Sequence, residues 1–284
     1  MLTEPTVHLE KSEYGKLIDF DEAARYLGYG EVRPTAEIWE ELQECAERLK
    51  EALCPAWRYI AARLVREEVK EGVLPREELA ADFGRERLAL PGKSIREHLS
   101  GSELVLCAGL TLGAEVDERL ELLQRESMLS ALLFDALANA AVERLRVLLE
   151  ERAAADFPDM RPNWLFGIGY GDLPLALQSD FLRLTEAKRE LGLACSEKLI
   201  LIPTKSVTGF LGLFPKEAPC IPDTAPLRET SQAEAGRKPC EDVPTRTAGK
   251  ETGTVPSAGR TSACGKGSCA ECQLRASCPF SEKG

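Results

Sequence analysis

Four cysteines near the C-terminus have a spacing that could hold a metal. Cys264, Cys269, Cys272 and Cys278 lie within 15 residues, in a C-x4-C-x2-C-x5-C arrangement with small residues between them. The C-x4-C-x2-C run is typical of ferredoxin-type iron–sulfur ligands. A tetrahedral zinc site is compatible with the same thiolates. The spacing favours an iron–sulfur cluster over zinc, with free or reversibly oxidised thiols as the alternative.

A second distinctive stretch is a tyrosine between two glycines, ahead of a helical pattern. It reads Gly169-Tyr170-Gly171-Asp172-Leu173-Pro174-Leu175, followed by Gln178. Glycine lets the backbone approach a ligand closely, and tyrosine supplies an aromatic face and a hydroxyl. The residues alone favour a tight turn without a ligand, in which Asp172 is the N-cap or a first-turn acid of the next helix and Pro174 stands in its first turn.

Other motifs fail on inspection. Gly92-Lys93-Ser94 resembles part of a phosphate-binding loop, but Arg87 stands where that motif requires its first glycine. The run 167–172 has an aspartate at the third glycine of a dinucleotide-binding fingerprint. The only histidines, His8 and His98, are far apart in sequence. Surface or packing roles are expected for both, and not metal binding or catalysis.

Hydrophobic periodicity predicts the elements that position these residues. Helices are expected where apolar residues recur at steps of three and four, and strands where short apolar runs end at glycine or proline. The predicted helices cover 14–29, 34–52, 116–154 (undivided or split near Ser127) and 173–191, with a loop over 158–171. The predicted strands cover 103–108, 198–202 and 207–213, and the last two would form a hairpin through 203–206.

The composition changes after Pro215. Residues 216–260 are rich in proline, threonine, alanine, glycine and charge. Such a segment buries too little apolar surface to offset the entropy lost on ordering. We therefore predict a folded domain over 1–215, a disordered linker over 216–260 and a cysteine-containing tail over 261–284.

The charge distribution limits the classes of partner. The chain has a net charge of −11, and residues 1–215 carry 26 basic against 38 acidic side chains. An acidic body is unsuited to a nucleic-acid backbone or an anionic membrane, because both require positive charge. Neither a signal segment nor a long apolar span is apparent, so we expect a cytoplasmic protein.

Two blocks resemble the activation (reactivation) domain of vitamin B12-dependent methionine synthase. The stretch Gly169–Gln178 is similar to the Gly-Tyr-Gly-Asp-x-Pro-Leu-x-x-Gln of stand-alone proteins related to that domain. The stretch Ser196–Gly209 looks like the domain's Thr-Glu-Ser…Ala-Ser-Val-Ser-Gly hairpin. Residues 26–29, 104–115 and 135–140 also fit the stand-alone subfamily, so the resemblance covers about 14–215 in the right order.

The resemblance implies a fold, a ligand and a partner. The fold would be α+β, a twisted antiparallel sheet with surrounding helices, followed here by the disordered tail. The ligand would be S-adenosylmethionine, which in this family methylates cobalamin after reduction of the cob(II)alamin form. The positions that match the family's binding residues are Gly169, Tyr170, Gly171, Asp172, Ser206 and Val207. The Asp-x-His-x-x-Gly signature of many corrinoid proteins is absent from the sequence, so a partner would carry the cobalamin.

One position departs from the family. Leu165 stands five residues before Tyr170, where the family has an arginine that would hold the ligand's carboxylate. Losing a charge-assisted contact of about 1.5–3 kcal/mol weakens binding by about 10- to 150-fold. The spacing predicts that residue 165 faces the pocket and that S-adenosylmethionine binds weakly. Arg161, one helical turn upstream, is a candidate substitute.

The sequence supports one leading hypothesis and two alternatives. The leading one is an accessory protein for cobalamin-dependent methionine synthase, or a related corrinoid methyltransferase, that docks on the cobalamin-binding partner and works with an electron donor. The chain is too short to be a complete methionine synthase. The alternatives are a metal- or thiol-based redox protein and a small-molecule sensor, each retaining the fold.

We predict that the four tail cysteines bind a metal in protein purified without oxygen. Iron, sulfide and zinc analysis should find metal in the wild type and a loss of it in Cys269→Ser and Cys272→Ser, because each removes one thiolate ligand. Cys45→Ser serves as the control. Metal-free wild type, or metal content unchanged by both tail substitutions, would contradict the prediction.

Overall fold

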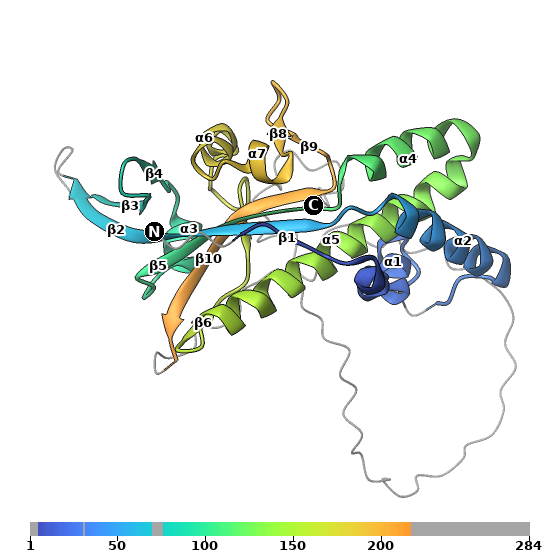
Figure 1. The fold of residues 1–284 in the computed structure, drawn as a ribbon, viewed down its shortest axis with the longest axis horizontal. Coiled ribbons are helices and arrows are strands. Elements are labelled where there is room, and N and C mark those ends of the chain that lie inside the picture. Colours follow the sequence, from blue (N-terminus) through green and yellow to red (C-terminus); the bar gives the residue numbers. More distant parts are fainter. Residues whose placement is uncertain (1–4, 31, 70–75, 217–284) are drawn as a thin grey trace, which may run out of the picture. The chain divides into compact units, whose positions relative to one another are not determined.

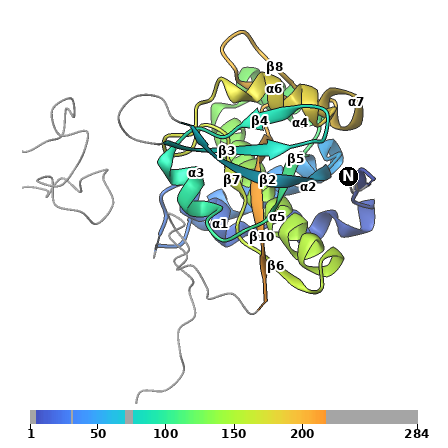
Figure 2. The same ribbon diagram turned by 90° about the vertical axis from the view of Figure 1, so that its left-hand side faces the viewer.

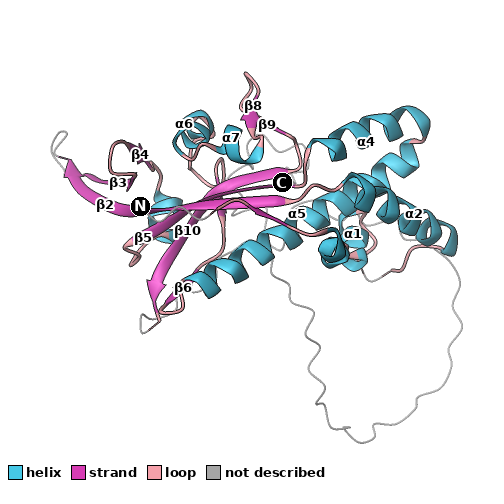
Figure 3. Cartoon of the chain, viewed as in Figure 1, coloured by secondary structure: helices cyan, strands magenta, loops and turns pink. Residues whose placement is uncertain are grey.

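The fold is built on a twisted antiparallel sheet. The computed structural model describes residues 5–30, 32–69 and 76–216. The six strands of the main path follow the spatial order β4-β3-β2-β5-β10-β6, while β1 pairs with β2 and β7 with β10 (Figures 1 and 3). The strands are β1 (Val7–His8), β2 (Ala56–Val69), β3 (Arg76–Asp82), β4 (Arg87–Ala89), β5 (Leu104–Thr111), β6 (Met160–Pro162), β7 (Phe166–Gly167) and β10 (Ser206–Pro215).

Helices cover both faces of this sheet. One layer contains η1 (Lys11–Leu17), α1 (Phe20–Tyr26), α2 (Ala36–Ala52), α4 (Ala114–Glu126) and α5 (Met128–Asp156). The other contains α3 (Lys93–His98) and α6 (Leu177–Leu184), with α7 (Ala187–Leu191) next to α6. In Figure 2, α6 and α7 lie above the strands and α5 lies below them.

The sequence of the central strand β5 is an uninterrupted apolar run because both of its faces are buried. Successive side chains of a strand point to opposite faces. Leu106, Ala108 and Leu110 belong to the core cluster under α5, whereas Val105 and Cys107 belong to the cluster under α3 and α6. Both faces of β5 are therefore buried, which removes the polar alternation typical of a half-exposed strand.

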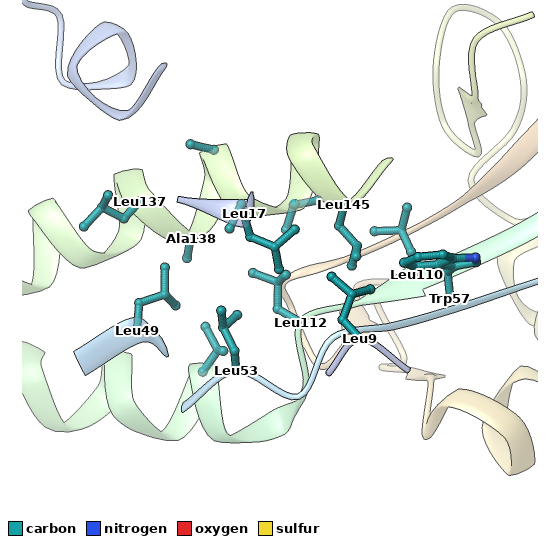
Figure 4. Packing of buried hydrophobic residues seen from close by; sticks show 14 of the residues in the cluster. Leu9, Leu17, Leu49, Leu53, Trp57, Leu110, Leu112, Leu137, Ala138 and Leu145 are labelled. Carbon is teal, nitrogen blue, oxygen red and sulfur yellow. The ribbon is translucent and has the colours of Figure 1, made fainter. Parts of the chain in front are cut away.

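Helix α5 forms the largest part of the core on its side of the sheet. Its small side chains Ala136, Ala138, Ala140 and Ala141 are all buried, which lets neighbouring elements approach the helix closely. Figure 4 shows Leu137, Ala138 and Leu145 of α5 close to Leu49 of α2, to Leu110 of β5 and to Leu112 just after that strand. Burying one leucine completely contributes about 1.5–3 kcal/mol, so this interface is a major source of stability.

Several predicted elements are confirmed. The helix expected over 34–52 is α2, which begins after Thr35, whose hydroxyl accepts the Ile38 N–H at 3.5 Å. The helical pattern over 116–154 is divided at Ser127, and the Ser127 hydroxyl accepts the Ser130 N–H at 3.2 Å. A serine that caps a new helix also ends the previous one, because its own backbone is extended. The strand expected over 103–108 is β5.

Other expectations are wrong. The helix predicted over 173–191 consists of two short helices, α6 and α7, and Pro174 lies in the turn before α6. The hairpin between 198–202 and 207–213 does not form. Instead β9 (Leu201–Ile202) pairs with β8 (Ala194–Cys195), and β10 pairs with β5. The strands β2 and β3 were not anticipated.

The predicted linker and cysteine-containing tail lie outside the described part of the chain, apart from Lys216. Strand β10 ends at Pro215. The rest of the linker at 216–260 and the tail at 261–284, with Cys264, Cys269, Cys272 and Cys278, lie beyond the last described residue and stay predictions. In the described part, no helix is both long enough and apolar enough to span a membrane.

We predict that Gly209→Ala destabilises the protein. A Cβ at Gly209 would lie 2.3 Å from the Phe166 carbonyl oxygen, where β7 pairs with β10. The two backbones would have to separate, at a cost of about 1–3 kcal/mol, which lowers the melting temperature by roughly 3–10 °C in a domain of this size. Gly15→Ala is the control, because no atom lies within 4 Å of its added Cβ. Equal melting of the two variants would contradict this packing.

Candidate functional site

The glycine–tyrosine turn and the start of β10 lie side by side. Gly167 is the register partner of Gly209, and the Ile168 N–H donates to the Thr208 carbonyl at 3.0 Å. Beyond this pair the chain turns back, with the Tyr170 N–H donating to the Gly167 carbonyl at 3.1 Å. The two blocks that carry the family resemblance are thus brought together by main-chain pairing.

The side chain of Gln178 joins the same two blocks from the opposite face. Its amide nitrogen donates to the Thr208 hydroxyl at 2.7 Å, and that hydroxyl lies 3.0 Å from the amide oxygen. Gln178 is buried, and a buried amide without a partner would be costly. The glutamine at the end of the motif therefore has a structural role, holding α6 against β10.

Tyr170 lies on the α5 side of the sheet, largely in solvent. Phe166 and Ile168 point into the cluster under α3 and α6, so alternation directs Gly167 toward α5. The Tyr170 ring packs over Gly167, 3.3 Å from where a Cβ would be, and 54% of the residue is exposed. An aromatic face is therefore open beside α5.

A second exposed tyrosine, Tyr26 at the end of α1, lies near the first. The pKa of Tyr26 is raised, first by burial and then by the negative charges of Glu143 and Glu22, with Tyr170 adding a smaller effect. Helix α1 packs against α5, and Glu143 on α5 acts electrostatically on the Tyr26 phenol. Tyr26 is 43% exposed, so two aromatic rings flank the same stretch of α5.

That stretch carries a row of polar side chains, which we name the α5 polar row: Asp135, Asn139, Glu143, Arg146 and Glu150. The spacing of three or four residues places them on one face of the helix. All five are partly buried. With Lys205, which contacts the row from β10's leading turn, the charged groups are three carboxylates and two cations. The row is close to neutral and can contact both positive and negative groups of a ligand.

One end of the row is anchored to the turn before β10. The Lys205 ammonium donates to Asp135 at 2.6 Å and to the Asn139 amide oxygen at 2.7 Å. The neighbouring Thr204 donates to Asp117 of α4 through its N–H at 2.6 Å and its hydroxyl at 2.7 Å. The turn at 203–206 is therefore held by both α4 and α5. Because β9 pairs with β8 and not with β10, the turn does not have to close a hairpin and can contact these helices.

At the other end, Arg146 is held between two carboxylates. Its Nε donates to Glu143 at 2.9 Å, and its Nη1 donates to Glu150. The same Glu150 oxygen accepts the Leu165 N–H at 2.9 Å. Burial lowers the pKa of Arg146, but Glu150 and Glu143 outweigh it and the net shift is upward. The guanidinium stays charged and close to the backbone of residue 165.

Ser206 and Val207 point to opposite faces of the sheet. The Ser206 hydroxyl donates to the Thr111 hydroxyl at 2.8 Å, on the same face as Thr208. Val207 packs against the core cluster under α5. Only Val207 therefore faces the polar row and the tyrosines, while Ser206 can take part there through its backbone alone.

Asp172 does not cap the helix that follows it in sequence, as the tight-turn interpretation expected, but caps α3. Its carboxylate accepts the N–H groups of Lys93 at 2.6 Å and Ser94 at 2.9 Å, the first residues of α3. These bonds, that to Lys93 first, lower the pKa of Asp172. Asp172 thus fastens the tyrosine turn to α3. The Gly92-Lys93-Ser94 segment, which does not form a phosphate-binding loop, supplies the N–H groups that Asp172 caps.

Residue 165 and its predicted substitute also lie elsewhere than expected. Leu165 is 2% exposed and belongs to the core cluster under α5, so it does not line an open pocket. Arg161, in β6, lies over the Phe214 ring at 5.5 Å, at the edge of the sheet. The expectation that residue 165 faces the pocket is wrong, and Arg161 lies away from the polar row.

Several residues of this neighbourhood were missed from the sequence. Glu143, Arg146, Glu150 and Lys205 were not singled out, although the spacing of charges inside the long apolar helix was a visible signal. A charged residue recurring on one face of an otherwise buried helix indicates contact with another polar element. What that element is could not be read from the helix.

Metal ligands are not gathered in the described part of the chain. No group of three or more histidine, cysteine, aspartate or glutamate side chains is placed there to hold a metal. Cys45 and Cys107 are buried, and burial raises the pKa of both thiols. The four tail cysteines are outside this region.

Comparison with known proteins identifies the fold. No family model matches the chain, and the search of curated proteins finds no match. Among solved structures, one described as the MetH reactivation domain bound to AdoHcy matches over 78% of this chain and 81% of its own, with 13% identity and a TM-score of 0.53. The protein has the mixed helical and antiparallel-sheet fold of that domain, which confirms the predicted fold class.

We predict that Asp172→Ala lowers stability in a pH-dependent manner. Because the pKa of Asp172 is depressed in the folded state, its stabilising effect is present above the unfolded pKa of about 3.9 and is lost as pH falls through the folded value. The difference in melting temperature between wild type and variant should be largest near neutral pH and narrow below about pH 4. Asp159→Ala is the control, and a pH-independent difference for Asp172→Ala would contradict this cap.

Proposed function

We propose that this protein is an accessory factor for cobalamin-dependent methionine synthase or a related corrinoid methyltransferase, supporting reductive reactivation of cobalamin. The observation that carries the proposal is the fold shared with the MetH reactivation domain, together with the meeting of the glycine–tyrosine turn and β10. At 13% identity the match supports the shared fold alone. The functional proposal therefore rests on the local arrangement of the turn and β10.

The proposed ligand is S-adenosylmethionine or its product. The MetH neighbour is described as bound to AdoHcy. In this chain Tyr170 and Tyr26 offer exposed rings for the adenosine or sulfonium group. The α5 polar row and Val207 border them. Gly169 and Gly171 have φ angles of 90° and 55°, and a Cβ at either would meet Leu175 or Ser94, so these glycines shape the turn that presents Tyr170. These groups fit a zwitterion that carries both signs of charge.

Arg146 is proposed to replace the arginine that position 165 lacks. It shares Glu150 with the Leu165 N–H, so its guanidinium lies near the backbone of that position. Its two carboxylate partners compete with a ligand carboxylate, which agrees with weak binding. The positive charge is thus retained, but it comes from α5.

Cobalamin is proposed to be carried by the partner, a cobalamin-binding protein or the corresponding modules of methionine synthase. The α5 polar row contains carboxylates, an amide and a guanidinium, which bind and orient but do not supply the imidazole typical of cobalt ligation. Reduction of cob(II)alamin also requires an electron donor. An iron–sulfur or zinc centre on Cys264, Cys269, Cys272 and Cys278 is a proposal that concerns the tail alone.

We predict weak binding of S-adenosylmethionine that depends on Tyr170 and Arg146. Titration calorimetry should give an affinity loss of about tenfold for Tyr170→Ala, and Tyr170→Phe should keep most of the binding because the ring remains. Arg146→Gln should lose about 10- to 150-fold if its charge contacts the carboxylate. Arg48→Gln on α2 is the control. Wild-type binding that none of these variants alters would place the ligand elsewhere.

The corrinoid partner is tested separately. The full chain should alter the absorbance of a cobalamin-binding module of methionine synthase in its cob(II)alamin form, at tens of micromolar protein. No change would count against the accessory role and favour the redox or sensor alternative. Measurable ligand binding without such a change would favour the sensor.

A further inference from the structure

The junction of α4 and α5 exposes four large apolar side chains, which we name the elbow patch: Leu122, Met128, Leu129 and Leu132. Their exposed fractions are 43%, 71%, 46% and 58%. They lie within 11 residues, around the break at Ser127. Figure 1 shows this junction at the end of the sheet opposite the tip of β2 and β3, where α4 turns back into α5.

Helices α4 and α5 each already bury one apolar face in the core, and the elbow patch is an additional apolar face that stays exposed. Leu123 of α4 and Leu133 and Leu137 of α5 are at most 2% exposed and form part of the core. A surface helix normally has one apolar stripe, and a helix apolar on several sides is normally buried. Contiguous exposed apolar side chains on a soluble domain mark an interaction site.

Acidic side chains outnumber basic ones beside the patch. Glu118 and Glu126 stand four residues before and after Leu122 on the same face of α4, with Glu121 beside it, while Arg119 and Arg125 stand three residues before and after it. None of the three glutamates forms an ion pair with another described residue. Helix α4 has five acidic and two basic residues, and α2 has six and two. The two helices are neighbours, since Arg119 lies 3.8 Å from Glu51.

We propose that the elbow patch binds a basic amphipathic helix of a partner protein. The partner's leucine-type stripe would cover Met128, Leu129 and Leu132, and its lysines or arginines would face Glu118, Glu121 and Glu126. Recognition of an amphipathic helix in this way uses flexible methionine and leucine contacts with charge complementarity at the rim. The acidic rim disfavours a second copy of the chain and an anionic membrane, because both would bring like charges together. The inference is independent of the proposed function.

The test uses a fluorescently labelled 18-residue peptide of leucine and lysine at helical spacing, and a matched peptide with glutamate in place of lysine. Anisotropy with the full-length wild type should show salt-sensitive binding of the lysine peptide alone. The double variant Met128→Gln/Leu132→Gln should weaken it at least tenfold, and Glu118→Gln/Glu126→Gln should weaken it and reduce its salt dependence.

Exposed apolar residues elsewhere provide the control. Leu175→Gln and Ile200→Gln change side chains of 43% and 55% exposure outside the elbow patch, and should bind the peptide as the wild type does. Circular dichroism establishes that each variant is folded. Peptide binding that is unchanged in both elbow variants, or equally weakened in the control variants, would overturn the proposal. So would self-association of the wild type that Met128→Gln/Leu132→Gln abolishes without affecting peptide binding.

Discussion

The main-chain pairing of β10 is the constraint on which the rest of the structure depends. On one side β10 follows β5 from Ser206 to Leu213, and on the other it contacts β7 and then β6. The β7 contact requires a glycine, because a Cβ at Gly209 would collide with the Phe166 carbonyl. Three segments of the candidate site are connected to this strand. The tyrosine turn follows β7, Lys205 precedes β10, and Gln178 fixes α6 to Thr208.

The α5 polar row shows how a long buried helix carries polar contacts. Its charges are paired inside the chain, Arg146 with two glutamates and Lys205 with Asp135. Pairing is necessary because a partly buried charge without a partner is costly. These pairs position the turn before β10 and the backbone of Leu165 against α5. Their value lies in orientation, since replacing such pairs by apolar packing is often neutral for stability.

Leu165 is an apolar core residue at the position where the family resemblance implies an arginine. The leucine completes the core under α5, and Arg146, which shares Glu150 with the Leu165 N–H, is already held by two carboxylates. A ligand carboxylate would have to compete with them. Under the proposed function, this arrangement would suit a weaker or differently oriented ligand than an arginine at position 165 would. The shared fold and the altered charge are separate facts, and the fold alone does not define the ligand.

Local patterns in the sequence determined helix α2 and strand β5 and left a break near Ser127 as one of two alternatives, because periodicity and capping depend on neighbouring residues. The fold class was implied by the family resemblance. The sequence also indicated that the Tyr170 turn and the Ser206 segment belong together, through their resemblance to one family. Tertiary structure alone decided the partners. β10 pairs with β5 and not with 198–202, Asp172 caps α3 and not its own helix, and Leu165 is buried while Arg146 is held nearby. Each depends on contacts between residues far apart in the chain, which local spacing does not encode.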